Sequence, residues 1–128
     1  MLIVVCWRMI KIKKGLTLRH VALTDVLGYY ETETDELSKK MLMSYPKDME
    51  EAKKDVKEHI SENKAKPIIS ENFTIMHNGN YAGYVKIQFQ NFDPNSKDGR
   101  IHAAIHPDYR MKGLATLAIR AIIKYGFE

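Results

Sequence analysis

The sequence predicts a single domain of the mixed α+β class, because strand and helix patterns alternate along it and no linker or internal repeat divides it. Three segments carry this prediction. Residues 73–89 alternate around an Asn-Gly turn like an antiparallel hairpin, residues 46–60 repeat apolar side chains at helical spacing, and residues 100–127 run from a short strand through a glycine turn into an apolar helix. With 128 residues, 45% of them apolar, the chain can bury one modest core.

The first strand and a helical region are predicted early in the chain. Residues 16–23 alternate as a half-buried strand does, and the two residues that follow offer a side-chain cap to a helix. The helical pattern of residues 25–45 is interrupted by Gly28 and by the polar run 31–36. Two short helices or one broken helix would both fit this pattern.

A longer helix is predicted to start at Pro46, a residue that suits the first turn of a helix. Up to the polar stretch 61–66, its apolar side chains recur at helical spacing, namely Met49, Ala52, Val56 and Ile60. Residues 47–66 also mix acidic and basic side chains, which is typical of a solvated helix face.

The net charge of +4 would permit contact with an anionic cofactor, an acidic substrate or nucleic acid. A nucleic-acid surface needs Lys and Arg gathered on one face beside exposed aromatic side chains. The cations of this chain are scattered along it, so nucleic acid is the weaker alternative.

Residues 1–15 are interpreted as an N-terminal leader or an extra strand, before a domain of residues 16–128. The apolar opening, residues 1–7, lacks a basic lead and a following cleavage site, and it is far too short to span a membrane. Cys6 is the only cysteine, which excludes an intramolecular disulfide and a cysteine-rich metal site and favours the reducing cytoplasm. The five histidines form no helical pair or other ligand motif, so no metal is predicted.

A hairpin and a further strand are predicted in the second half. Strands at 73–77 and 81–89 flank the tight turn, and residues 91–99 are rich in turn-forming residues and predict a loop. The next strand, residues 100–106, is closed by Pro107.

The final helix, residues 112–127, carries more apolar surface than one face of a sheet can cover. One side of it presents Leu114, Leu117, Ala118, Ala121, Ile122 and Tyr125. Ile119 and Ile123 lie beyond this stripe, which predicts an uncovered apolar side.

The turn at residues 109–116 joins this strand to this helix and offers several backbone N–H groups to an anion. A helix N-terminus has unpaired amide hydrogens and a partial positive charge. Gly113 and the small Ala115 would let a diphosphate approach the main chain closely. The turn therefore predicts a nucleotide-like cofactor.

The order of elements and this turn together resemble the GNAT superfamily of acyl-CoA-dependent N-acetyltransferases. The signature of that superfamily is Gln or Arg, two residues, Gly, one residue, then Gly or Ala. It is matched by Arg110-Met111-Lys112-Gly113-Leu114-Ala115. The flanking segments 107–109 and 118–127 are similar to the branch that includes ribosomal-protein N-terminal acetyltransferases, and the resemblance covers about residues 16–128. It implies a central, mostly antiparallel sheet flanked by helices and truncated after the cofactor-binding helix.

The resemblance implies acetyl-CoA as the cofactor. Backbone amides of Lys112 to Thr116 would hold its pyrophosphate, with the side chains of Arg110 and Lys112 adding charge. The alternative is an ordinary capped helix with solvated side chains. The preceding strand would pair with the pantetheine arm, and the Ile105 N–H would polarise the acetyl carbonyl, although core packing is the plainer role for Ile105. The cofactor-binding candidates are Ala104, Ile105, Arg110, Met111, Lys112, Gly113, Leu114, Ala115 and Thr116.

Acetyl transfer to an amine needs a group that removes a proton, because an amine is largely protonated near neutral pH. Related enzymes often use a strand carboxylate, and the position aligned with it is Arg100, which cannot act as a base. His102 and His106 share its strand face and are the catalytic candidates, with a structural or surface role as the alternative.

The acceptor-side wall of the family falls on the first helical region of this chain. Tyr29, Tyr30 and Glu31 are therefore candidates for contact with the amine substrate, although tyrosines at such positions also serve as core or rim residues.

The leaving-group acid of the family is usually a tyrosine on the helix after the next strand, a region that this sequence does not contain. We therefore leave open whether the chain is an active enzyme. The implied function is transfer of acetyl from acetyl-CoA to a primary amine of a protein N-terminus or a small molecule. The alternative is a noncatalytic coenzyme A binding or regulatory module, or an inactive fragment. The unpaired edge of strand 100–106 further predicts a homodimer formed through it.

Overall fold

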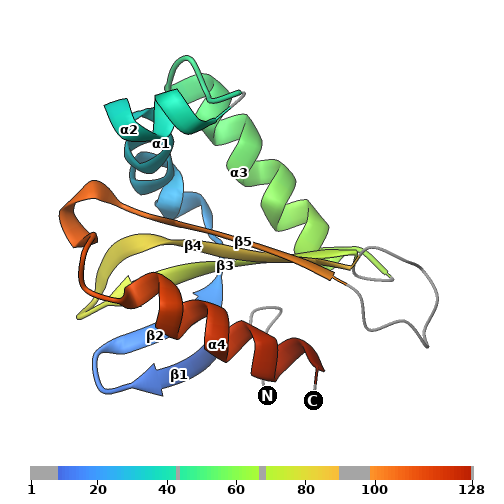
Figure 1. Ribbon diagram of the computed structural model, residues 1–128. Coiled ribbons are helices and arrows are strands. Elements are labelled where there is room, and N and C mark those ends of the chain that lie inside the picture. Colours follow the sequence, from blue (N-terminus) through green and yellow to red (C-terminus); the bar gives the residue numbers. More distant parts are fainter. Residues whose placement is uncertain (1–8, 43, 67–68, 90–98, 128) are drawn as a thin grey trace.

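The computed structural model describes residues 9–42, 44–66, 69–89 and 99–127, and it shows an antiparallel sheet with helices on both faces (Figure 1). The sheet has five strands in the order β1-β2-β3-β4-β5, so each strand pairs with its neighbour in the chain. Their bounds are β1 Met9–Lys13, β2 Leu16–His20, β3 Ser70–His77, β4 Asn80–Phe89 and β5 Gly99–Ile105. The predicted α+β class is confirmed.

The predicted hairpin is formed by β3 and β4. Its turn residues Asn78 and Gly79 have φ angles of 50° and 83°, the left-handed values that a two-residue hairpin turn requires. The predicted loop at residues 91–99 falls almost entirely outside the described residues, which resume at Gly99 in β5.

Within the segment 1–15, interpreted as a leader or an extra strand, Met9–Lys13 forms strand β1. It pairs antiparallel with β2 and lies at one edge of the sheet. Lys11 and Lys13 are exposed on it, and lysines on an edge strand oppose pairing with a further chain.

The first helices cover one face of the sheet (Figure 1). A 3-10 turn, η1 Leu23–Asp25, leads into α1 Val26–Thr34, and α2 Glu36–Met41 follows. The interruption comes at Asp35, in extended conformation, and not at Gly28. Gly28 lies within α1 and directly against the ring of Tyr81, where a Cβ would collide with the ring.

The next helix, α3 Met49–Lys64, packs beside α1 and begins three residues later than predicted. Asp48 is its N-cap, accepting a hydrogen bond from the Glu51 amide at 2.9 Å. The Glu51 side chain in turn accepts from the Lys47 amide at 3.1 Å. Capping chemistry thus decides the helix start, and Pro46 is buried just before it.

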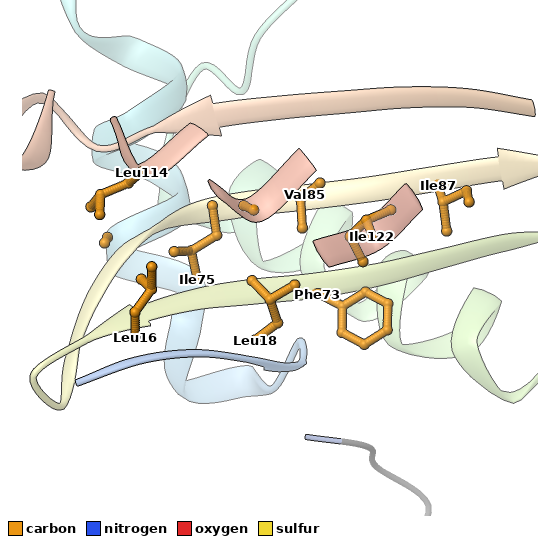
Figure 2. Close-up of a cluster of buried hydrophobic side chains, with 10 residues drawn as sticks. Leu16, Leu18, Phe73, Ile75, Val85, Ile87, Leu114 and Ile122 are labelled. Atoms are coloured by element: carbon orange, nitrogen blue, oxygen red, sulfur yellow. The ribbon is translucent and has the colours of Figure 1, made fainter. Parts of the chain in front are cut away.

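The last helix, α4 Leu114–Phe127, covers the opposite face of the sheet. Figure 2 shows the core between α4 and the sheet, in which Leu114 and Ile122 of α4 meet side chains from three strands. The strand side chains labelled there are Leu16, Leu18, Phe73, Ile75, Val85 and Ile87, all fully buried.

The two surfaces predicted to be uncovered are present in the described part of the chain. β5 is at the end of the strand order, so one of its edges has no neighbouring strand there. Ile123 of α4 is 45% exposed, whereas Ile119 is half-buried. None of the described helices is both long and apolar enough to cross a membrane.

Candidate functional site

The turn between β5 and α4 has an unusual backbone. After the 3-10 turn Pro107–Tyr109, Met111 and Gly113 both have positive φ, 67° and 73°. This region is costly for a residue with a side chain, by about 1 kcal/mol or more. Met111 is fully exposed, so core packing does not compensate this cost. Strain of this kind at an exposed turn is typical of a binding site.

The turn leaves the first amides of α4 outside the backbone hydrogen bonds of the helix. The first backbone hydrogen bond of α4 runs from Leu117 N to Gly113 O at 3.2 Å, so the amides of Leu114, Ala115 and Thr116 precede it. No acceptor for these three amides occurs in the described ranges. A Cβ built on Gly113 would meet no atom within 4 Å. The turn therefore fits a diphosphate, which needs close approach and free donors.

Arg110 of the motif has a partner that the sequence did not suggest. Its guanidinium forms two hydrogen bonds to the Asp35 carboxylate, at 2.8 and 2.9 Å, and a third to Ser38 Oγ at 3.2 Å. Its Nε also donates to the Ile105 carbonyl at 3.1 Å. The side chain thus ties the turn to the junction of α1 and α2, and it is not the freely solvated group considered above. Lys112 is exposed.

The Arg110 guanidinium holds the pKa of Asp35 well below its usual range, chiefly through these hydrogen bonds. A lowered folded-state pKa adds stability above the unfolded pKa, and this stability is lost as the pH falls through the folded value. Asp35→Asn should therefore lower the free energy of unfolding by about 1 kcal/mol at neutral pH, since the pair is partly exposed. The difference in the free energy of unfolding between Asp35→Asn and the wild type should become smaller as the pH falls through the folded-state pKa of Asp35.

Urea unfolding at pH 7 and at a series of pH values below about 4, the unfolded pKa of an aspartate, measures this effect. The matched control is Glu36→Gln, because Glu36 is the exposed neighbour of Asp35 and should matter little. An equal loss in both variants at pH 7, or a difference that does not shrink as the pH falls below the unfolded pKa of an aspartate, about 4, would contradict the role of the pair.

Strand β5 presents different side chains to its two sides. Ile101, Ala103 and Ile105 pack toward the core under α4, so His102 and Ala104 face the side of α1. The amide of His106 donates to Ala82 O at 2.8 Å, toward β4. Because successive amides of a strand alternate in direction, the N–H of Ile105 points to the open edge.

His106 is buried and both of its ring nitrogens have partners. Nδ1 accepts from the Asp108 amide at 3.1 Å, so the ring hydrogen is on Nε2, which lies 3.0 Å from Glu31 Oε1. The structure thus brings together His106, a catalytic candidate, and Glu31, a substrate candidate. The acidic partner is supplied by α1, far away in the sequence.

His102 belongs to a second set of polar contacts. Its Nε2 lies 3.2 Å from the hydroxyl of Tyr84, and that hydroxyl donates to Glu33 Oε1 at 3.0 Å. Sequence analysis missed Tyr84 and Glu33. The signal for Tyr84 is its alternation with the core residues of β4, whereas Glu33 lies in the polar run 31–36, whose composition indicates only a helix interruption.

Burial dominates the proton affinities in this set. It raises the pKa of Glu33, an effect that the hydrogen bond from Tyr84 opposes and the charges of Asp55 and Asp35 reinforce, and it raises the pKa of Tyr84 strongly. Burial also lowers the pKa of His102, and the nearby Lys86 lowers it further. The carboxyl group is thereby made a better proton acceptor and the imidazole is kept neutral.

Tyr29 and Tyr30 lie on α1 as expected for the acceptor-side wall. Tyr29 is buried, and its hydroxyl donates to Asp55 at 3.0 Å. Its ring packs against those of His59 and Tyr84. Tyr30 is half-buried beside the same cluster. Both tyrosines therefore also serve the packing of α1.

Two hollows occur elsewhere on the described surface. One, of about 540 Å³, lies between the end of β2 and the last turn of α3. The other, of about 480 Å³, lies between β1 and α4. Residues 110–116 line neither of these two hollows. Across the described ranges, no group of three His, Cys, Asp or Glu side chains is placed to hold a metal ion.

Comparison with known proteins gives one matching family and several matching folds. A model of the acetyltransferase (GNAT) domain matches residues 15–128. RimL, a ribosomal L7/L12 alpha-N-protein acetyltransferase, matches with a TM-score of 0.76 at 16% identity, over 93% of this chain and 64% of that protein. MccE, a microcin C7 self-immunity acetyltransferase solved with acetyl-CoA and AMP, matches with a TM-score of 0.74 at 18% identity, over 90% of this chain and 64% of MccE.

A GNAT-family acetyltransferase from Bacillus anthracis matches with a TM-score of 0.72 at 23% identity, over 94% of this chain and 66% of that one. At such identities the likeness shows the fold. The chain spans 64% of the length of RimL and of MccE. A search of curated proteins found no match.

Proposed function

The chain belongs to the GNAT acetyltransferase family, and from this premise we propose that it transfers an acetyl group from acetyl-CoA to a primary amine. GNAT acetyltransferases use acetyl-CoA, and MccE has been solved with it. The observation that carries the proposal is the turn before α4, where three free amides and the uncovered Gly113 fit a diphosphate.

The cofactor would lie along the open edge of β5. The amides of Lys112 to Thr116 would hold its pyrophosphate, and the backbone at Ala104 and Ile105 would pair with its arm. When bound, acetyl-CoA supplies an acetyl group activated as a thioester. The N–H of Ile105, directed to this edge, would donate to the carbonyl oxygen as negative charge develops on it.

The amine would approach from the side of α1. Glu31 has a half-exposed side chain there, and its carboxylate can attract an ammonium group before the proton is removed. Tyr29 and Tyr30 form the wall behind it. His102 and His106 lie on the same side of β5, which supports their assignment to proton transfer or orientation.

The acceptor is proposed to be a protein N-terminus or a small-molecule amine. RimL, which acts on the ribosomal protein L7/L12, supports the first choice, and a spermidine N-acetyltransferase among the matching structures supports the second. We further propose residues 16–128 as the domain, the cytoplasm as its location and a homodimer through the part of the free β5 edge that the cofactor would leave uncovered. The single cysteine supports the cytoplasmic location. The exposed Ile123 supports the homodimer.

A second candidate function is a noncatalytic coenzyme A binding module. It is favoured by Arg100, an exposed cation on β5 at the position that carries a carboxylate base in related enzymes. Binding of acetyl-CoA without acetylation of any amine would select this candidate.

Calorimetric titration with acetyl-CoA tests the proposal. We expect heat of binding and a raised melting temperature, because a ligand that binds only the folded state stabilises it. Acetyl-pantetheine, which lacks the diphosphate, is the matched control and should bind far more weakly. Mass spectrometry of a peptide with a free N-terminal amine then measures transfer. No heat and no thermal stabilisation at millimolar acetyl-CoA would count against both candidates.

A further inference from the structure

Three hydrogen-bonded side chains run from the interior beneath α1 to the exposed face of β5. The Glu33 carboxylate accepts from the Tyr84 hydroxyl at 3.0 Å, and the same hydroxyl lies 3.2 Å from Nε2 of His102. The three residues come from α1, β4 and β5. Glu33 is 8% exposed, whereas His102 is open to solvent, so the set connects a buried carboxylate to the surface.

Glu33 differs from the other buried carboxylate on this face in its charged neighbours. Asp25, the other buried carboxylate on this face, is paired with the guanidinium of Arg19. Around Glu33 the titratable groups are the hydroxyls of Tyr84 and Tyr29 and the carboxylates of Asp55 and Asp35, and no cation pairs with it in the described residues. A buried carboxylate among hydroxyls and acids holds a proton more readily than one beside a cation.

We propose that Glu33, Tyr84 and His102 form a proton relay, in which a proton released by the acceptor amine at His102 ends on the Glu33 carboxylate. The proposal rests on the acetyltransferase function proposed above. In this relay Glu33 is the final proton acceptor. Strand β5 itself has no carboxylate for this role, because its aligned base position holds Arg100.

The relay moves one proton by breaking and forming three bonds. Nδ1 of His102 takes a proton from the amine nitrogen, which keeps its lone pair for the acyl carbon. Nε2 of His102 gives its hydrogen to the Tyr84 oxygen, and the Tyr84 hydroxyl gives its own to Oε1 of Glu33. The imidazole stays neutral and changes tautomer, the tyrosine is unchanged, and the carboxylate becomes a carboxylic acid. The reverse steps return the proton to solvent.

Each member has the chemistry that its place needs. A neutral imidazole accepts at one nitrogen and donates at the other, and a phenol hydroxyl does both at one oxygen. Lys86 of β4 is close enough to lower the pKa of His102, which opposes a stable imidazolium at the entrance. His106 cannot serve as the entrance in this arrangement, because Asp108 and Glu31 occupy its two nitrogens.

The tautomer of His102 in the protein alone provides the first test, read from the ¹⁵N shifts of its ring. In the wild type we expect the hydrogen of the neutral ring on Nε2 while Glu33 is ionised and on Nδ1 once Glu33 holds a proton. Glu33→Gln and Tyr84→Phe should abolish the switch. A wild-type ring that keeps one tautomer, or a switch that survives in both variants, would overturn the relay.

Kinetics with acetyl-CoA and a peptide with a free N-terminal amine provide the second test. Glu33→Gln and Tyr84→Phe should each lower kcat about tenfold or more, the usual scale for lost proton transfer. Their calorimetric affinity for acetyl-CoA should stay unchanged. The rise of kcat with pH that reflects ionisation of Glu33 should disappear in Glu33→Gln.

Glu71→Gln is the matched control, because it makes the same change to a buried carboxylate that accepts from a tyrosine hydroxyl, that of Tyr125 in α4, on the other face of the sheet. Its kcat should stay close to that of the wild type. An equal loss in Glu71→Gln, or an unchanged kcat in Glu33→Gln, would reject the relay. If the wild-type protein binds no acetyl-CoA, the proposed function fails, and the tautomer measurement alone decides the relay.

Discussion

Gly113→Val is expected to weaken acetyl-CoA binding about a hundredfold, the equivalent of losing about two charge-assisted hydrogen bonds. Gly113 has a φ of 73°, where a β-branched residue is strained, and the new side chain would project into space that is empty within 4 Å. That space is where a diphosphate must lie to reach the amides of Leu114 to Thr116. Calorimetric titration with acetyl-CoA measures the change.

Gly79→Val is the matched control for the strain. Gly79 has a φ of 83° and equally open surroundings, but it lies in the β3–β4 turn. Both variants should lose about 1–2 kcal/mol of stability from the unfavourable backbone. Only Gly113→Val should lose affinity. Normal binding by Gly113→Val would show that the cofactor does not use this turn, and an equal loss in Gly79→Val would show that strain alone explains the effect.

Asp25→Ala is expected to lower the free energy of unfolding by about 3 kcal/mol, since it leaves a largely buried cation without its partner. Asp25 is 3% exposed and Arg19 17%. The carboxylate accepts two hydrogen bonds from Arg19, at 2.8 and 2.9 Å, one from Thr74 Oγ1 at 2.7 Å and one from the Ala22 amide at 2.9 Å. Because Asp25 directly precedes α1, the variant should also weaken the packing of α1, the helix that carries Glu31 and Glu33, against the sheet.

Urea unfolding of Asp25→Ala is compared with that of Asp48→Ala. Asp48 caps α3 at the surface through a single hydrogen bond, so its loss should cost about 1 kcal/mol. A smaller loss for Asp25→Ala than for Asp48→Ala would show that the buried ion pair does not hold η1 and α1 in place.

The hairpin and the turn before α4 could be predicted because their signals are local. Asn78, Gly79 and Gly113 are needed where φ is positive, and this requirement depends only on neighbouring atoms of the backbone. The sequence predicts the start of α3 three residues early, because Pro46 suits a helix start but the capping pair Asp48 and Glu51 decides it. Competing local signals of similar strength leave a boundary uncertain by about a turn.

By itself, the sequence determined the α+β class, the hairpin, the apolar helix α4 and the glycine turn, since each depends on spacing or on backbone freedom within a few residues. Only the tertiary structure decided which side chains meet. Arg110 and Asp35 are 75 positions apart, and Glu33 and Tyr84 are 51 apart. Such pairs depend on strand register and on how α1 lies across the sheet, because both set which distant side chains come within hydrogen-bonding distance.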